Sequence, residues 1–570
     1  MTESSPKLAG ARSGEGLRAW LGAGLVSLAT ALVILAPFYW LGTASGHDIQ
    51  FHISSWLDAA GQWKEGILFP RWTEWANYGF GEPRFIFYPP LSWMLGAALG
   101  NVVPWTWTPA IFVLLVQTFA GISAFALVRR FVSSYWAALL GAAVYAANPY
   151  ALLVIYLRSD YAELLATSFY PLLFLVAFRL VGFSESDTPL RKNLAWFGIL
   201  FGVVWLSNAP AGVLASYSLA LLFFWAAITQ RALQPTLRGA GGLALGFGLA
   251  SFYVVPAAYE QRWVNITSAL ATGLAPAENF LFARTPDAEH DAFNGLASYV
   301  AVLMMVWTLA AAVVLWRRGR AGQEDRGHEK AFAATFVLAF AASVMMTRAT
   351  TPFWSYLPKL RFVQFPWRWM AVLAVAFAVF VAAVAARRAV IISWIAVVIV
   401  LSSTGAYLVQ HTWWDSEDVN SVEAAVDGGT GFEGTDEYDP LGDDHTDIPQ
   451  KQPEAKLIAE EEADPVPKSD VRVIRWTAED RVVIAKTKEP ALIRLRVLHH
   501  PAWSVTVNGK PVKTTRTISY NAITVPVPAG ESRIEAQFTR TKDRVVGGAI
   551  SVLSALAALV IAWMPKRQQA

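Results

Sequence analysis

The polar residues best suited to chemistry begin at His47, where the chain leaves its first long apolar run. Asp48 follows directly, and His52 comes four residues after Asp48. A carboxylate at a membrane–water boundary is partly desolvated, which raises its proton affinity toward that of a general base. In a helical segment, Asp48 and His52 would share a face. The spacing therefore indicates an acid–base group, with Asp48 as the base and both histidines shaping its proton affinity.

Two other interpretations of these residues stay open. Asp48 can be the N-cap of a surface helix that runs through Ile53 and Trp56 to Trp63. A His-Asp-x-x-x-His set can also hold a metal, although its three side chains are not all free to converge. The sequence alone does not decide between catalysis, capping and metal binding.

Two further polar clusters contain arginine. Arg158, Asp160 and Glu163 occur in RSDYAE between two apolar runs, and Arg368 occurs in QFPWRW. Arginine donates bidentately to a phosphate, and a neighbouring acid can position a substrate hydroxyl. The alternatives are a self-satisfied ion-pair cluster for RSDYAE and an aromatic belt with a snorkelling arginine for QFPWRW.

Arg71 and Trp72 are further candidates for substrate contacts in the segment after the first apolar run. Arg71 could extend a phosphate-binding patch, and Trp72 could stack on a sugar ring or pack the segment onto its own helices. The adjacent histidines His499 and His500 point to opposite faces of a strand, so they form a poor chelate. The chain has no cysteine, which excludes thiolate catalysis and cysteine-ligated zinc. No sequence feature supports nucleic-acid binding.

Hydrophobic patterning determines what must position these residues. The 570 residues are 55% hydrophobic and 16% charged, against about 25% charged residues in soluble proteins. Long apolar runs recur, so we predict a mainly α, polytopic membrane protein with about twelve spans. The shorter Leu91–Val103 segment is interpreted as a juxtamembrane helix. The predicted spans are 18–41, 108–128, 133–151, 165–183, 194–208, 211–229, 240–258, 298–316, 331–347, 370–386, 389–409 and 546–564.

The placement of lysine and arginine predicts the orientation. Every second loop is short and basic, which is the positive-inside pattern and places both termini in the cytoplasm. The opposite set of loops would then face the outside of the cytoplasmic (inner) membrane. That set carries nearly all the candidate residues, so we expect them to converge on one face.

Composition divides the chain into four parts. Residues 1–410 form the polytopic domain, in which 42–107 is the outer loop that carries Asp48. Residues 411–470 are acidic and rich in glycine and proline, which predicts a linker. Residues 471–545 alternate in five short strands with a hairpin turn at Asn508-Gly509, which predicts a small outer β-sandwich. Residues 546–570 are a last span and a basic tail.

This arrangement resembles the GT-C superfamily of polyprenyl-phosphate-sugar-dependent glycosyltransferases. The shared features are one N-terminal span, a large outer loop that opens on an acid, many spans and a C-terminal outer domain. Individual segments resemble bacterial YfhO-type membrane proteins, especially the group called 6-pyruvoyl-tetrahydropterin synthase related. These segments are GHDIQFH, FPRW, NYGFGEP, FIFYPPLSW, RSDYAE, QFPWRW, HPAWSVTVNGKPV and VPVPAG.

The resemblance implies a GT-C-like fold and a function. The protein would move a sugar from a polyprenyl-phosphate donor to a glycan or lipid acceptor at the outer face of the membrane. Asp48 would take the place of the first-loop acid that deprotonates the acceptor, and Arg158 and Arg368 would contact the departing phosphate. A single acid follows His47, where some of these enzymes have two, so the need for a divalent metal stays open.

A non-catalytic transporter or an assembly factor for cell-envelope polysaccharide is the alternative function. The enzymatic interpretation requires Asp48, Arg158 and Arg368 to line one cavity. The spans hold few charges near the membrane midplane, which counts against a transporter.

Overall fold

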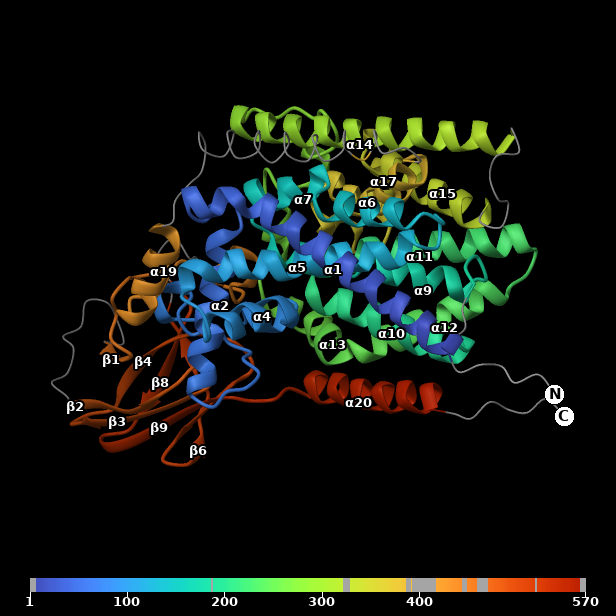
Figure 1. Cartoon of the computed structure of the whole chain (residues 1–570). Helices are drawn as coiled ribbons and strands as arrows, with labels where there is room; N and C mark the ends of the chain where they lie inside the picture. Colours follow the sequence, from blue (N-terminus) through green and yellow to red (C-terminus); the bar gives the residue numbers. More distant parts are fainter. Residues whose placement is uncertain are drawn as a thin grey trace.

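The protein consists of a bundle of long helices and a smaller β-domain at one end of it (Figure 1). In this computed structural model the described residues are 7–185, 188–320, 329–385, 391, 417–442, 448–458, 470–517 and 520–563. The arrangement agrees with the predicted mainly α fold that carries a C-terminal β-domain.

Within the described residues, eight helical segments are long and apolar enough to cross a membrane, so the chain is a membrane protein. They are Gly16–Leu41 in α1 (Lys7–Leu41), Trp105–Val128 with α5 (Thr108–Val128), Tyr135–Arg158 with α6 (Tyr135–Ala146) and α7 (Pro149–Leu153), Tyr161–Leu180 with α8 (Tyr161–Ser168) and α9 (Tyr170–Leu180), Ala209–Gln230 as α11, Ala288–Gly319 in α14 (Ala288–Arg320), Pro366–Val384 with α17 (Met370–Val384), and Lys542–Trp563 as α20.

Two bent pairs of helices raise the number of spans to ten if each pair is one span. The first joins α12 (Gln234–Leu249) to Ser251–Trp263, which contains α13 (Ser251–Glu260), with a bend of 76°. The second joins α15 (Glu329–Met345) to Arg348–Tyr356, which contains α16 (Thr351–Tyr356), with a bend of 89°. The described residues therefore contain eight to ten candidate spans, whereas the sequence predicts about twelve for the whole chain.

The difference from twelve spans has two sources. The predicted span 194–208 is α10 (Leu190–Ser207), whose first turn contains Arg191, Lys192 and Asn193, and these polar residues lower its mean hydropathy. The predicted span 389–409 lies outside the described residues, apart from residue 391. The 91–103 segment forms α4 (Pro90–Gly100), whose 11 residues are too few to cross about 30 Å of hydrocarbon.

The large loop after α1 folds into helices that lie against the bundle. Its main element is α2 (Ile49–Lys64), followed by the single turn α3 (Arg84–Phe87) and by α4. Trp56 of α2 is fully buried and lies directly against the backbone of Gly96 in α4, where a Cβ atom would collide with the indole ring. This close contact fixes α2, and with it Asp48 and His52, relative to the spans.

The β-domain contains two antiparallel sheets in the described residues. The strands of the first sheet have the order β1-β4-β8-β7 and those of the second β2-β3-β9-β5-β6. Their bounds are β1 Ala455–Ile458, β2 Asp470–Trp476, β3 Asp480–Thr487, β4 Ala491–Leu498, β5 Trp503–Val507, β6 Lys510–Pro511, β7 Thr515–Arg516, β8 Ala522–Val527 and β9 Gly530–Phe538.

The hairpin between β5 and β6 turns at Asn508-Gly509, as the sequence predicts. Both residues have positive φ, 51° and 75°, which the tight two-residue turn of a hairpin requires. In its described residues the domain has nine strands where five are predicted. The first predicted strand is divided into β2 and β3, β6 and β7 are additional two-residue strands, and β1 precedes residue 471.

The acidic segment 411–470, predicted to be a linker, contains two of the elements. Helix α19 (Glu417–Asp427) lies against α2, and Ser45 donates a hydrogen bond to Asp418 at the start of that helix. Strand β1 pairs with β4 in the β-domain. The described part of this segment is therefore built into both domains.

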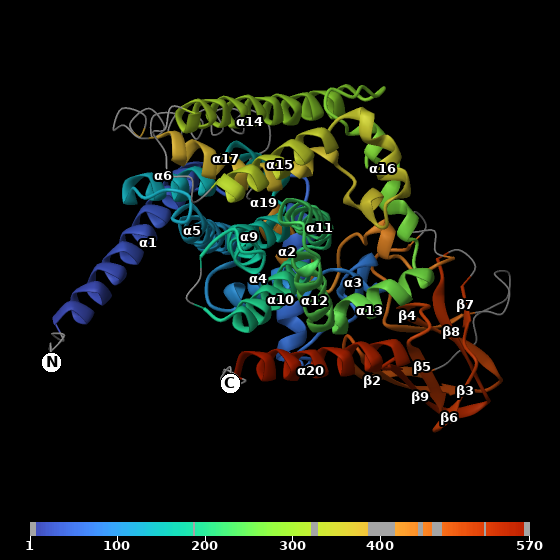
Figure 2. The same ribbon diagram turned by 90° about the vertical axis from the view of Figure 1, so that its right-hand side faces the viewer.

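A buried ion pair joins α20, the helix that follows the β-domain, to the helical bundle. Arg544, at the start of α20, donates two hydrogen bonds to the carboxylate of Glu260 at the end of α13, at 2.6 and 2.8 Å. His500 of the β-domain lies 3.9 Å from the same carboxylate. From this point α20 runs back along α13 (Figure 2).

We predict that Glu260→Gln lowers the thermal stability of the chain. The change leaves the Arg544 guanidinium buried without an opposing charge, which typically costs about 3 to 5 kcal/mol. Thermal unfolding of the detergent-solubilised protein, followed by tryptophan fluorescence, measures the effect. The control is Glu289→Gln, because Glu289 is exposed. Equal unfolding temperatures for the two variants would contradict the structural role of the pair.

Candidate active site

Two segments about 110 residues apart are joined by backbone hydrogen bonds at the candidate site. The amide of His47 donates to the carbonyl of Leu157 at 3.2 Å, and the amide of Asp48 donates to the carbonyl of Arg158 at 2.8 Å. The amide of Gly46 donates to Ser159 Oγ at 3.0 Å. The segment after α1 is thus fixed against the turn between α7 and α8.

This junction depends on two unusual backbone positions. Ser159 has a φ of 53°, in the left-handed region that a side chain occupies at some cost. A Cβ atom at Gly46 would lie 2.6 Å from the carbonyl carbon of Arg158. The chain can approach this closely only because residue 46 is glycine.

The junction brings Asp48 into an ion pair with Arg158. Arg158 also lies 3.5 Å from the carboxylate of Asp160, and Arg368 reaches that carboxylate at 3.0 Å. Arg368 contacts Glu163 as well, at 3.1 Å. These five side chains, which we name the ion network, come from the first loop, from the α7–α8 turn and the first turn of α8, and from the segment before α17.

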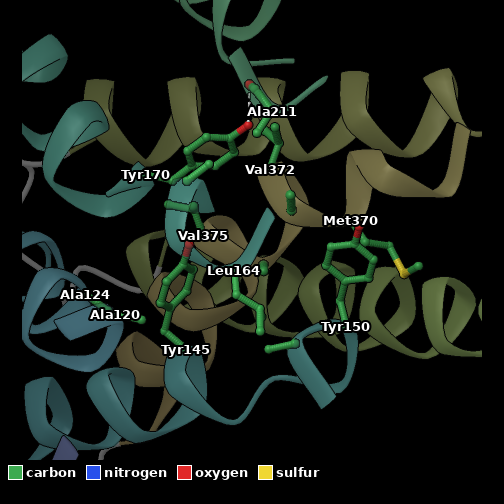
Figure 3. Close-up of a cluster of buried hydrophobic side chains, with 14 of the residues drawn as sticks. Ala120, Ala124, Tyr145, Tyr150, Leu164, Tyr170, Ala211, Met370, Val372 and Val375 are labelled. Atoms are coloured by element: carbon green, nitrogen blue, oxygen red, sulfur yellow. Dashed lines mark hydrogen bonds between the residues drawn. The ribbon is translucent and has the colours of Figure 1, made fainter. Parts of the chain in front are cut away.

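Glu163 lies at the inner side of the ion network. Tyr150 donates a hydrogen bond to its carboxylate, and Figure 3 shows Tyr150 beside Leu164 and Met370 in the apolar core. Asp160 has a further structural role, because it caps α8 by accepting a hydrogen bond from the Glu163 amide at 2.9 Å. Contacts with the apolar core and with α8 therefore fix the positions of Glu163 and Asp160.

A cavity of about 850 Å³ opens beside the ion network. Asp48, Arg158, Asp160 and Arg368 line it, whereas Glu163 does not. Three members of the network at the cavity are almost fully buried, but the side chain of Asp48 is 33% exposed. Asp48 is therefore the most accessible carboxylate of the network.

Both histidines predicted for the site line the cavity. His52 is buried, and its Nε2 lies 3.8 Å from a carboxylate oxygen of Asp160. Burial lowers the pKa of His47, and the Arg158 guanidinium lowers it further. His47 is therefore a neutral imidazole near pH 7.

The charge state of Asp160 follows from its surroundings. Burial alone would raise the pKa of Asp160, but the His52 imidazole and the guanidinium groups of Arg158 and Arg368 outweigh it. The net result holds the pKa of this carboxyl well below its usual range. Asp160 is thus a fixed negative charge between the two arginines, unable to accept a proton near pH 7.

Apolar side chains of three helices also line the cavity. Trp205, Pro210, Val213 and Val254 line it from α10, α11 and α13. Lys359 lines the cavity as well and donates to Gln261 Oε1 at 2.8 Å. The cavity therefore combines the charged groups of the ion network with apolar side chains and a lysine.

One wall of the cavity comes from a segment that sequence analysis assigned to the linker. Residues between Phe432 and Tyr438 line the cavity. The ring of Tyr438 stacks on Phe87 of α3, with centroids 5.8 Å apart. One sequence signal could have identified this wall. The segment GFEGTDEY contains two aromatic residues, and solvated linkers are poor in aromatic residues.

Arg71 and Trp72, predicted to contact substrate, lie away from the cavity. The amide of Arg71 donates to Glu479 of the β-domain at 3.1 Å, and the guanidinium lies 3.9 Å from the ring of Phe69. Trp72 is fully buried and contacts the rings of Trp503 and Phe538. Both residues belong to the interface between the first loop and the β-domain, and our proposal gives them no contact with substrate.

The acids that could coordinate a metal are committed to arginines. Asp48, Asp160 and Glu163 each contact Arg158 or Arg368. In the part of the chain that the structure describes, no group of three or more His, Cys, Asp or Glu side chains is arranged to hold a metal ion.

Comparison with known proteins identifies the family. A family model described as the 6-pyruvoyl-tetrahydropterin synthase related domain, a membrane protein, matches residues 85–411. The chain belongs to this family. The matched range of the 6-pyruvoyl-tetrahydropterin synthase related domain contains Arg158, Asp160, Glu163 and Arg368, whereas Asp48 lies before it.

The chain is also similar to a solved structure, the apo oligosaccharyltransferase of Archaeoglobus fulgidus. The TM-score is 0.39 at 14% sequence identity, and the match covers 71% of this chain. The matched region spans 56% of the length of that oligosaccharyltransferase. A comparison with curated proteins gave no match.

We predict that Gly46→Ala disturbs the ion network. The added methyl group must push the Asp48 segment away from Arg158, and overpacking of this kind typically costs about 1 to 3 kcal/mol. Gly61→Ala is the matched control, because a Cβ atom at Gly61 in α2 meets nothing within 4 Å. Thermal unfolding of the two variants measures the effect. If Gly61→Ala and Gly46→Ala lower the unfolding temperature equally, the close contact between residue 46 and the Arg158 backbone is refuted.

Proposed function

We propose that this protein is a GT-C-like glycosyltransferase of the cytoplasmic membrane. It would move a sugar from a polyprenyl-phosphate donor to a glycan or lipid acceptor on the outer face. Both termini would be cytoplasmic and the β-domain would lie outside. The observation that carries the proposal is that one cavity is lined both by the ion network and by apolar side chains of α10, α11 and α13.

The two kinds of side chain that line the cavity, apolar and charged, fit the two parts of a lipid-phosphate sugar. Trp205, Val213 and Val254 offer an apolar surface to a polyprenyl chain, and Lys359 offers a cation to the phosphate. The sugar would then lie beside Asp48 and Arg158. A cavity of about 850 Å³ falls within the roughly 300–1,000 Å³ of small-molecule sites.

Arg158 has a donor group free for a ligand. Its Nη1 is buried and makes no hydrogen bond to any described residue. A buried donor without an acceptor costs about 1 to 3 kcal/mol, so an anion placed at this atom would remove that cost. We assign Arg158 to the departing phosphate, where its hydrogen bond would strengthen as negative charge develops.

Asp48 is predicted from the sequence to be the base that deprotonates the acceptor. In the structure its carboxylate accepts a hydrogen bond from Arg158. In our proposal Asp48 therefore positions Arg158, and its partly exposed side chain places it at the edge of the reaction centre.

The alternative is a transporter or an assembly factor for cell-envelope polysaccharide. One observation favours a transporter: α13, which lines the cavity, follows a bend of 76° after α12, and broken helices mark the binding sites of many transporters. A transporter would move a labelled lipid or glycan without forming a new glycosidic bond, which separates the two functions experimentally.

We predict that Asp48→Asn abolishes most sugar transfer. Without its negative partner Arg158 loses its position, and we expect a fall of about 100-fold or more, the scale on which positioning errors act. The measurement is transfer of radiolabelled mannose, glucose or arabinose from polyprenyl phosphate in reconstituted membranes. The control is Glu531→Gln, an exposed acid of the β-domain. Unchanged transfer by Asp48→Asn would refute the proposed site.

We predict that Lys359→Gln weakens binding of the donor. The variant removes the lysine cation from the cavity, so the KM for the lipid-linked sugar should rise about tenfold, whereas Lys359→Arg should stay close to wild type. Initial rates at varied donor concentration give the KM of each variant. A KM that is the same in Lys359→Gln and Lys359→Arg would place the phosphate elsewhere.

A further inference from the structure

The wall of the cavity formed by residues 432–438 is held firmly against the first loop. The amide of Thr435 donates to Glu82 at 2.8 Å, and its hydroxyl accepts from Arg84 at 3.0 Å. The amide of Phe432 donates to the carbonyl of Trp75 at 3.0 Å. The backbone of this wall is therefore fixed against the first loop.

Four carboxyl groups of the described residues line the cavity: Asp48, Asp160, Glu433 and Glu437. Asp48 and Asp160 form ion pairs with arginines, and Glu433 is exposed. Glu437 is half-buried and forms no ion pair within the described residues. It is the carboxyl in this group that is both shielded from water and uncommitted to an arginine.

Aromatic rings connect Glu437 to the ion network. The ring of Phe51 lies 6.3 Å from that of Tyr438, the neighbour of Glu437, and 4.6 Å from that of Tyr88. Tyr88 in turn lies 6.0 Å from the ring of His52. Phe51 and Tyr88 line the cavity between the two acidic positions. A flat apolar surface with polar groups at both sides suits a small polar ligand such as a sugar.

The charge of Glu437 responds to pH near neutrality. Burial raises the pKa of Glu437 to about 7, and its backbone hydrogen bond acts in the opposite direction. The charged groups that face it are Glu82 and Arg84 of the first loop and Asp436 of its own segment. Arg84 is already paired with Glu82 at 2.6 Å. As the pH rises through about 7, Glu437 loses its proton and becomes able to accept another.

We propose that Glu437 binds the attacking hydroxyl of the acceptor and takes its proton. The acceptor oxygen forms the bond to the anomeric carbon of the donor sugar, and the hydroxyl proton moves to the Glu437 carboxylate. The bond from the anomeric carbon to the phosphate oxygen breaks, and its electron pair leaves with the phosphate beside Arg158. This assignment rests on the proposed function, and it makes Glu437 a catalytic residue while Asp48 positions Arg158.

The test compares transfer rates from pH 5.5 to 8.5 in the full-length reconstituted protein, with the donor panel above and envelope membranes as acceptor. We expect Glu437→Gln to lower kcat about 100- to 10,000-fold and to abolish the rise of the rate through about pH 7. The KM for the donor should stay within about twofold of wild type. Glu437→Asp, which keeps a carboxyl group, should restore the rise at a reduced rate.

Asp427→Asn is the matched control. Asp427 is an exposed acid at the end of α19 in the same region of the chain and does not line the cavity. It should leave both the rate and its pH dependence unchanged. Thermal unfolding of each variant shows whether it is folded.

Two failures can be told apart. If the wild-type protein transfers no sugar from any donor, the proposed function falls and the Glu437 assignment falls with it. If the wild type is active and Glu437→Gln keeps the rate and the pH rise, only the Glu437 assignment is overturned.

A second measurement applies even if Glu437→Gln fails to fold. A hydrophobic carbodiimide, dicyclohexylcarbodiimide, reacts with protonated, shielded carboxyl groups, and peptide mass spectrometry locates the adduct. In the wild-type protein we expect labelling of Glu437 to decline as the pH rises through about 7. Absent or pH-independent labelling of Glu437 would overturn the assignment.

Discussion

The desolvated ion network is the constraint on which the rest of the site depends. Charges removed from water are costly unless they are paired closely, and removal of one partner leaves the other uncompensated. Arg158 and Arg368 therefore require Asp48, Asp160 and Glu163 at short range, and three distant parts of the chain must meet to provide them. The same requirement explains why a glycine stands at position 46 and why Ser159 adopts a left-handed conformation.

The network also explains how one cavity can serve two kinds of substrate. Its arginines and acids nearly offset one another, so the part of the cavity that they line is polar without being strongly basic. Lys359 lines the cavity, and so do the acids Glu433 and Glu437 on the wall formed by residues 432–438. An anionic lipid would be attracted to Lys359 and repelled by Glu433 and Glu437. In our proposal the two acids therefore face the neutral acceptor. In our proposal these charges place the donor phosphate beside Lys359 and the acceptor hydroxyl beside Glu437.

The convergence of Asp48, Arg158 and Arg368 could be predicted from the sequence because the charge pattern places their loops on the same side of the membrane. Residues in loops on the same side of the membrane can come into contact, and membrane topology identifies those loops. The β-domain and its Asn508-Gly509 turn could also be predicted, since strand alternation and turn residues are local signals. Asp48 does stand at the N-cap position of α2, as one interpretation of the sequence predicts, but its side chain makes no capping hydrogen bond and pairs with Arg158 instead.

The remaining features depend on partners that no local pattern reveals. Trp72 is an aromatic loop residue in the sequence, but its ring partners Trp503 and Phe538 are more than 400 positions away. Glu437 lies in a segment whose acidity and glycines indicate a linker. The wall it belongs to forms only because the first loop offers Glu82, Arg84 and the carbonyl of Trp75 as partners.

The central claim is that one cavity binds a lipid-phosphate sugar with its sugar at the ion network. A cryo-electron microscopy structure of the full chain in lipid nanodiscs, with a polyprenyl-phosphate sugar bound, tests this claim directly. The account predicts density for the polyprenyl chain along Trp205 and Val254, the phosphate between Lys359 and Arg158, and the sugar beside Phe51 and Tyr88. Donor density outside this cavity, or an empty cavity at saturating donor, would contradict it.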